Sequence, residues 1–157
     1  MKRYIRSNKL DYLLEYIERS NYIFDNPETV NEVSQIIKTY GNISGKVDLY
    51  RRVSFNELGI SEQLFNDDPF SIIDKIITPQ GFMSTSKYID GTSNFDGQLI
   101  HFTNVSPSNK GLDISTFSWM YSSFGDEEEV IFNIGTKYKI TNIVQYDDNI
   151  ILEAKIF

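Results

Sequence analysis

Apolar residues recur every three or four positions in the first third of the chain, which is the spacing of an amphipathic helix. Two such stripes are present, Leu10, Leu13, Leu14 and Ile17, followed by Val30, Val33, Ile36, Ile37 and Tyr40. Asn26, Pro27 and Glu28 precede the second stripe as an N-cap, a first-turn proline and an acidic first turn. Gly41 is a stop signal after it. We therefore expect helices before residue 45.

Beyond residue 45 the pattern is that of strands. Extended runs cover residues 46–53, 81–86, 99–102, 112–114, 130–134, 138–144 and 150–157. Asp147, Asp148 and Asn149 predict the turn of a terminal hairpin. One or two short helices are expected between residues 61 and 77, the second of them beginning at Asp68-Pro69. The sequence thus predicts an α+β protein whose β core is antiparallel or mixed.

The composition excludes several kinds of functional site. The 157 residues include no Cys and one His, and 15 Lys+Arg against 22 Asp+Glu give a net charge of −7. A disulfide framework, a zinc–thiolate site, a thiolate nucleophile and a multi-histidine metal site are therefore excluded. The acidic balance argues against a nucleic-acid partner held by phosphate attraction, although it leaves room for a local basic patch.

The length fits one compact domain, which we expect over residues 1–157, with a helical part at 1–45 and a β-rich core at 46–157. Acidic residues from Asp11 onward interrupt any apolar run at the start, and no stretch approaches the ~20 apolar residues of a membrane span. We expect a soluble monomer with no signal peptide and no membrane partner. It would act in the cytoplasm of the producing or target cell, or leave by a signal-independent route.

An arginine stands on the apolar face of the first predicted strand. Alternate residues of a strand share a face, so Arg51 points the same way as Leu49 and Val53. A guanidinium in that setting needs a partner, because its desolvation is costly. The partner is either a structural carboxylate or a bound anion such as a phosphate, which arginine grips with two hydrogen bonds. This segment alone favours a structural salt bridge, or a strand-end arginine that reaches water.

Two further segments carry unusual chemistry. Ser84, Thr85 and Ser86 follow an apolar pair, although a strand end that satisfies its own hydrogen bonds explains them equally well. Later, an acidic run from Asp126 continues into an apolar strand, where Glu127 and Glu129 share a face about 6–7 Å apart. A solvated loop is the ordinary explanation of such a run. Two like charges on a partly buried face instead favour a functional site, and paired carboxylates can stabilise a sugar oxocarbenium ion.

In order, these segments read "LYRRVS", "GFMSTS" and "DEEEVIF". Together they resemble the arginine–serine–glutamate class of mono-ADP-ribosyltransferases, and in particular the enzymatic components of clostridial binary toxins. The later stretch "NIGTKYKI" is similar to that family as well, so the resemblance covers residues 46–157. It implies the family's fold, in which N-terminal helices pack on two small, mostly antiparallel β-sheets.

The resemblance also implies roles for the first two segments. Arg51 would hold the phosphates of NAD, and the main chain of Arg52 would meet the nicotinamide carboxamide. Ser84 would position the catalytic glutamate by a hydrogen bond, while Thr85 and Ser86 would support its strand.

The acidic segment would carry the reaction itself. Glu129 matches the glutamate that binds the nicotinamide ribose and stabilises the oxocarbenium-like transition state. Glu127 matches the residue that orients or deprotonates the acceptor. Family members with Glu at this position tend to modify arginine, so the resemblance implies an arginine acceptor.

Two loops would complete the site. Residues 87–97 would cover the NAD, with Phe95 as a stacking aromatic, and Gln98 stands where some toxins carry a phosphate-binding arginine, which predicts modest affinity for NAD. Residues 116–126 would recognise the target through Trp119, Tyr121 and Phe124. Either this aromatic loop packs inward or it presents a contact surface.

The implied protein is an NAD-dependent ADP-ribosyltransferase that needs no metal and modifies a protein, as a toxin, a phage protein or an effector. Two alternatives stay open, namely an NAD glycohydrolase with water as acceptor and a catalytically silent binding module. The segment before the first core strand is shorter than in binary toxins, and whether Tyr12, Tyr16 or Tyr22 replaces the missing contacts stays open. His101 lies on a predicted strand and is expected to be a structural or surface histidine.

Overall fold

The computed structural model describes residues 27–41, 43, 46–92, 96–114 and 128–157. Short 3-10 helices are labelled η. The elements in chain order are α2 (Pro27–Tyr40), β1 (Val47–Val53), α3 (Phe55–Leu58), α4 (Glu62–Asp67), η2 (Pro69–Ile72), β2 (Ile76–Ile77), β3 (Met83–Ser86), η3 (Ile89–Thr92), β4 (Gln98–Val105), η4 (Pro107–Asn109), β5 (Leu112–Asp113), β6 (Glu129–Phe132), β7 (Tyr138–Tyr146) and β8 (Asn149–Ile156).

The strands form a mixed sheet in the order β2-β7-β8-β4-β1-β3-β6-β5. Adjacent strands in this sheet are antiparallel except for β4 and β8, which run parallel to each other. The α+β class is therefore confirmed, but the expected division into two sheets is not. The sheet consists of a larger group of strands, β2, β7, β8, β4 and β1, and a smaller group, β3, β6 and β5. Tyr50 of β1 pairs with Ser86 of β3, and this one pair of residues joins the two groups into a continuous sheet.

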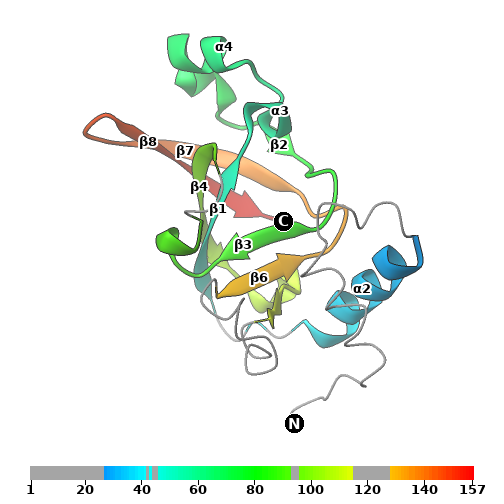
Figure 1. The fold of residues 1–157 in the computed structure, drawn as a ribbon. Coiled ribbons are helices and arrows are strands. Elements are labelled where there is room, and N and C mark those ends of the chain that lie inside the picture. The colour runs from blue at the N-terminus through cyan, green and yellow to red at the C-terminus, as the bar shows by residue number, and fades with distance from the viewer. Residues whose placement is uncertain (1–26, 42, 44–45, 93–95, 115–127) are drawn as a thin grey trace.

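Helix α2 covers one face of the smaller group of strands, beside β6 (Figure 1). Val33, Ile36 and Ile37 are buried there against apolar residues that include Leu112 and Ile131. The helix begins at Pro27, as predicted, and it ends at Tyr40, where the backbone N–H of Gly41 donates to the carbonyl of Ile37 at 3.0 Å. The earlier predicted stripe, from Leu10 to Ile17, lies outside the described residues.

The opposite face of β6 contributes to the main core. Because adjacent strand residues point to opposite faces, Val130 and Phe132 join this core while Ile131 packs under α2. Leu49 and Val53 of β1 are buried in the same core, one on each side of Arg51. The predicted apolar face of β1 is therefore confirmed, and the arginine lies within it.

The short helices α3 and α4 lie at the end of β1 where that strand finishes (Figure 1). Each begins at a serine whose side chain accepts a hydrogen bond from the backbone three residues on, Ser54 for α3 and Ser61 for α4. The predicted helix start at Asp68-Pro69 and the predicted terminal hairpin are both confirmed, by η2 and by the β7–β8 pair. None of the described helices combines the length and apolar character that a membrane crossing requires.

Candidate active site

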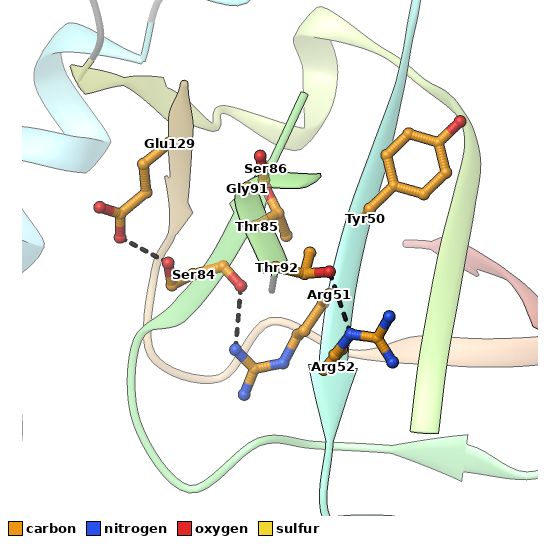
Figure 2. A pocket seen from close by; sticks show the side chains of 9 residues that line it. All are labelled: Tyr50, Arg51, Arg52, Ser84, Thr85, Ser86, Gly91, Thr92 and Glu129. Carbon is orange, nitrogen blue, oxygen red and sulfur yellow. Dashed lines mark hydrogen bonds between the residues drawn. The ribbon is translucent and has the colours of Figure 1, made fainter. Parts of the chain in front are cut away.

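A pocket opens beside the position where β1 pairs with β3 (Figure 2). It is lined by Tyr50, Arg51, Arg52, Ser84, Thr85, Ser86, Gly91, Thr92 and Glu129. The strand order places β3 between β1 and β6, so three segments that are distant in sequence meet there. Six of the residues that the sequence singled out, from Arg51 to Glu129, therefore lie around one cavity.

Ser84 and Glu129 point toward each other across the pocket wall (Figure 2). The Ser84 hydroxyl donates to Glu129 Oε1 at 2.5 Å, in partly buried surroundings. This contact follows from the β3–β6 register, in which Ser84 pairs with Ile131 and Glu129 lies two residues away on the same face. A hydroxyl donor fixes the carboxylate in one orientation, which suits a group that must face a developing positive charge.

The other two hydroxyl residues of β3 hold local structure. The buried Thr85 hydroxyl donates to the carbonyl of Val130 at 2.7 Å, which ties β3 to β6. Ser86 Oγ accepts from the backbone N–H of Tyr88 at 3.2 Å, at the turn into η3. Both bonds keep Ser84 in place opposite Glu129.

Arg51 finds a carboxylate, which is the partner that its segment alone favoured. Its Nη2 lies 2.6 Å from Glu57 Oε1 and its Nε lies 3.4 Å from Oε2, while Nη1 donates to the backbone carbonyl of Ser84 at 2.9 Å. The two paired side chains are 18% and 17% exposed, so the ion pair is largely shielded from solvent. Arg51 thereby joins β1, β3 and α3 beside the pocket.

Arg52 reaches to the other side of β1. Its Nε donates to Thr92 Oγ1 at 3.2 Å and its Nη1 to the carbonyl of Gly97 at 3.4 Å. Thr92 is itself fixed, since its hydroxyl donates to the carbonyl of Ile89 at 2.6 Å. The side chain of Arg52 thus anchors η3 and the start of β4 to the rim of the pocket.

Tyr50 stacks on His101 with ring centroids 4.8 Å apart and planes 19° apart. His101 Nε2 lies 3.5 Å from Asp48 Oδ2, with no hydrogen bond to it. The histidine therefore packs against Tyr50, which lines the pocket.

Lys87 forms ion pairs with Asp113 in β5 and with Glu128, the residue before β6, and we call these two contacts the Lys87 strap. Its ammonium lies 2.5 Å from Asp113 Oδ2 in β5 and 3.4 Å from Glu128 Oε2, and its backbone N–H donates to the carbonyl of Glu128 at 3.1 Å. Partial burial lowers the pKa of Lys87, but its bonds to Asp113 and Glu128 outweigh that effect and leave the pKa raised. The strap lies directly before Glu129 in the chain, so it helps to set where that residue begins its strand.

Not all predicted residues gather in the pocket. Gln98 is turned toward β8, where its amide donates to the carbonyl of Ile150 at 2.5 Å, and it is not among the lining residues. The remaining predicted residues, Glu127, Phe95, Trp119, Tyr121 and Phe124, lie outside the residues that the structure describes. Within the described ranges, no three or more His, Asp or Glu side chains are grouped as metal ligands.

Sequence reasoning missed Glu57 and Tyr138. It gave Lys87 and Thr92 no role of their own, although both lie in the loop at 87–97 that was expected to cover the NAD. A signal for Glu57 was present, since Ser54 and Gly59 bracket one short helical turn that begins directly after β1. A carboxylate in that turn stays close to the arginine that needs a partner. The bonds from Tyr138 to Glu57, from Lys87 to Asp113 and from Arg52 to Thr92 join segments that are distant in sequence, so no local spacing predicts them.

A family model for the ADP-ribosyltransferase exoenzyme matches residues 1–157. Among curated proteins, none matches the sequence significantly. The fold resembles that of the Clostridium limosum C3 exoenzyme, with 18% identity over 98% of this chain and 86% of that one and a TM-score of 0.77. It also resembles C3stau2 from S. aureus, solved with NAD, with 16% identity over 98% of this chain and 88% of that one and a TM-score of 0.77.

A third similar structure is the enzymatic component C2-I of the Clostridium botulinum C2 toxin, at 19% identity and a TM-score of 0.74. The match covers 98% of this chain but only 43% of C2-I, so the chain spans less than half the length of that component. At these identities the solved structures establish the shared fold, which is the fold that the resemblance implied apart from the division into two sheets.

Proposed function

Because the chain belongs to the ADP-ribosyltransferase exoenzyme family, we propose that residues 1–157 form a single catalytic domain that uses NAD to modify a protein. The enzyme would break the bond between nicotinamide and ribose and transfer ADP-ribose to a protein side chain, for which arginine is the proposed acceptor. One observation carries the proposal: the Ser84 hydroxyl holds the Glu129 carboxylate at 2.5 Å in the same pocket that Arg51 and Arg52 line.

Glu129 is proposed to act on the reacting sugar. As the C1′–N bond breaks, its electron pair leaves with neutral nicotinamide and the ribose gains positive charge. A carboxylate already oriented by Ser84 stabilises that charge without reorganisation. The acceptor nitrogen then bonds to C1′ and loses its proton, for which we propose Glu127 as the base.

Binding of the diphosphate is assigned to Arg51. A guanidinium has five N–H donors, and three of those of Arg51 are engaged by Glu57 and Ser84. One N–H on each terminal nitrogen is left with no partner among the described residues. Two such donors suit a pair of phosphate oxygens. NAD as the co-substrate is supported by C3stau2, solved with NAD, and by the binary enterotoxin component BECa of C. perfringens, solved with NADH.

An NAD glycohydrolase remains the second candidate function, because water could attack C1′ in the same pocket. The pocket itself argues against a catalytically silent module, since the arginine, serine and glutamate side chains are all in place. The two candidate activities share the bond that breaks and differ in the acceptor.

Labelled NAD incubated with the full chain and a cell lysate tests the proposal through free nicotinamide and label on protein. We expect Glu129→Ala to abolish both signals with little loss of fold by circular dichroism. Glu153→Gln, a change at a strand glutamate of β8 outside the pocket, should leave both signals unchanged. Nicotinamide release by Glu129→Ala at the wild-type rate would contradict the assignment.

Glu127→Gln separates the two candidate activities. We expect it to remove label from protein while part of the nicotinamide release remains, because the proposed role of Glu127 concerns the acceptor alone. Equal loss of both signals would argue against this division of roles. Nicotinamide release by the wild type without label on any protein would favour the glycohydrolase.

A further inference from the structure

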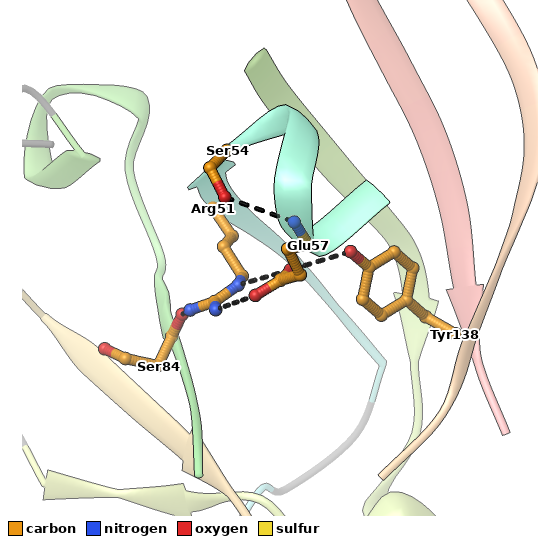
Figure 3. Close-up of polar contacts among 5 residues, drawn as sticks. All are labelled: Arg51, Ser54, Glu57, Ser84 and Tyr138. Carbon is orange, nitrogen blue, oxygen red and sulfur yellow. Dashed lines mark hydrogen bonds and ion pairs between the residues drawn. The ribbon is translucent and has the colours of Figure 1, made fainter. Parts of the chain in front are cut away.

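Glu57 lies between Arg51 and Tyr138 and touches both (Figure 3). Its Oε1 lies 2.6 Å from Arg51 Nη2, and its Oε2 accepts from Arg51 Nε at 3.4 Å and from the Tyr138 hydroxyl at 2.8 Å. The three side chains come from α3, β1 and β7. They form one continuous polar chain from the pocket wall into the core.

Glu57 is held from behind by its own helical turn. Its backbone N–H donates to the Ser54 hydroxyl at 3.2 Å, and the turn closes at Gly59, which has a φ of 67°. Leu58, the next residue, is fully buried in the main core. The carboxylate therefore has little freedom to follow Arg51 if the arginine moves.

Tyr138 is the most deeply buried of these three side chains. It is fully buried, and its ring meets Phe102 edge-on with centroids 5.2 Å apart. Burial, together with the negative charge of Glu57, raises the pKa of its hydroxyl well above the ordinary tyrosine value. Tyr138 is therefore a neutral hydrogen-bond donor, and its hydroxyl fixes Glu57 Oε2.

We propose that Glu57 and Tyr138 are positioning residues for the co-substrate, and that they hold Arg51 so that its two remaining N–H donors face the diphosphate of NAD. This inference rests on the proposed function. In the absence of Glu57, Arg51 would keep only its bond to the Ser84 carbonyl, and its long side chain would sample several rotamers. NAD would then have to order the guanidinium on binding.

A different role for Glu57 makes the opposite prediction. If the carboxylate served only to neutralise Arg51, its removal would raise the local positive charge and strengthen the binding of an anionic diphosphate. Under the positioning role, removal weakens binding despite the extra charge. The sign of the change in NAD affinity therefore distinguishes the two roles.

Tyr138→Phe is the cleanest test, because it removes one hydroxyl from Glu57 and keeps the buried ring. We expect KM for NAD to rise about 3- to 10-fold, which corresponds to the loss of one hydrogen bond, while kcat changes less than KM. Tyr40→Phe makes the same chemical change in α2, outside the pocket, and should leave KM unchanged. Glu57→Gln should also raise KM, whereas Glu57→Gln with a lower KM would overturn the positioning role.

Direct titration separates binding from turnover. In a Glu129→Gln background, NAD binding measured by calorimetry should weaken by the same factor when Tyr138→Phe is added. An active wild type with equal KM in Tyr138→Phe would overturn this inference and leave the proposed function standing. A wild type that neither binds nor cleaves NAD would overturn the proposed function and, with it, this inference.

Discussion

The Ser84 residue contacts two proposed functional side chains through different atoms. Its hydroxyl donates to Glu129, and its backbone carbonyl accepts from Arg51. Only the first contact depends on the side chain, so Ser84→Ala separates them. We expect the variant to keep NAD binding through Arg51 and to lose about 100-fold in kcat, because a misplaced catalytic group costs on this order.

The control for that variant is Ser71→Ala in η2. The Ser71 hydroxyl also makes one hydrogen bond, to the carbonyl of Asp68 at 2.8 Å, but on the exposed surface away from the pocket. Steady-state kinetics with NAD should show no change there. A Ser84→Ala enzyme with wild-type kcat would mean that Glu129 needs no fixed donor.

Tyr138 gives a prediction about alkaline stability. Its pKa is raised in the folded protein above the ordinary value of 10.0, so above that pH the unfolded chain releases a proton that the folded chain keeps. The stability that this group contributes is complete below pH 10 and is lost as the pH rises further. We expect the free energy of unfolding in urea to fall more between pH 8 and pH 11 in the wild type than in Tyr138→Phe. Equal falls in the two proteins would contradict a raised pKa.

The contacts of single side chains could be predicted where a charged group on an apolar face needs a partner. A guanidinium on an apolar face requires a partner, and the structure supplies one. The hydrogen bond from Tyr138 to Glu57 could not be predicted from the sequence, because 81 residues separate the two. Hydrogen bonds of that range depend on strand pairing, which carries no local spacing signal.

Among the strands and helices, the Lys87 strap joins β3 to β5 across the start of β6. Lys87→Met keeps the length of the side chain and removes its charge. We expect β6 amides such as that of Val130 to exchange hydrogen faster, and the free energy of unfolding to fall by about 1 kcal/mol. Lys139→Met removes a more exposed ion pair, with Asp74 at 3.5 Å, and should change neither quantity measurably. Unchanged exchange in Lys87→Met would show that the strap does not hold β6.

The approach of β4 to β1 depends on Gly97. This residue has a φ of 122°, and a Cβ atom built on it would lie 2.2 Å from the carbonyl oxygen of Val53. We expect Gly97→Ala to lower the free energy of unfolding by 3 kcal/mol or more, on the order of other strained or overpacked positions. Chemical denaturation measures the loss.

Gly135→Ala is the matched control for Gly97→Ala. Gly135 also has a positive φ, of 86°, but a Cβ atom there would meet nothing within 4 Å. Only the backbone term remains, so a loss of about 1–2 kcal/mol is expected. Equal losses at the two glycines would show that the close contact with Val53 relaxes at little cost.

Longer elements were predicted well because periodicity accumulates over several residues. Helix α2 and strands β1 and β8 agree with the predicted ranges to within about one residue. Strand β4 is longer than predicted, since its polar end at Thr103 and Asn104 carries no apolar signal. Strand β2, of two residues, is too short for any period to appear.

For the chain as a whole, the proposed single domain predicts one unfolding transition. The main core draws residues from strands β1, β2, β3, β4, β6, β7 and β8 and from the short helices after β1. The second apolar cluster, under α2, includes Ile131 of β6, so among the described residues the two clusters share that strand. We expect urea unfolding followed by near-UV and far-UV circular dichroism to give coincident curves. Two separated transitions would contradict a single domain.

The pocket was predictable as a set of residues but not as a shape. The order of the three motifs suggested that Arg51, Ser84 and Glu129 meet, and they do line one pocket. That β3 touches β1 at one position, and that the two predicted sheets are therefore continuous, depends on the twist and register of strands. Such features follow from packing across the entire core and leave no mark in a local pattern.

The two groups of strands that share the Tyr50–Ser86 pair are interleaved along the chain. β1, β2, β4, β7 and β8 belong to one group, and β3, β5 and β6 belong to the other. A break in the chain at any point between β3 and β6 consequently leaves both groups short of a strand. For recombination, we expect that a crossover between β3 and β6 with a distant relative would bring together strands that had never been selected to pack against one another, and so would damage the pocket.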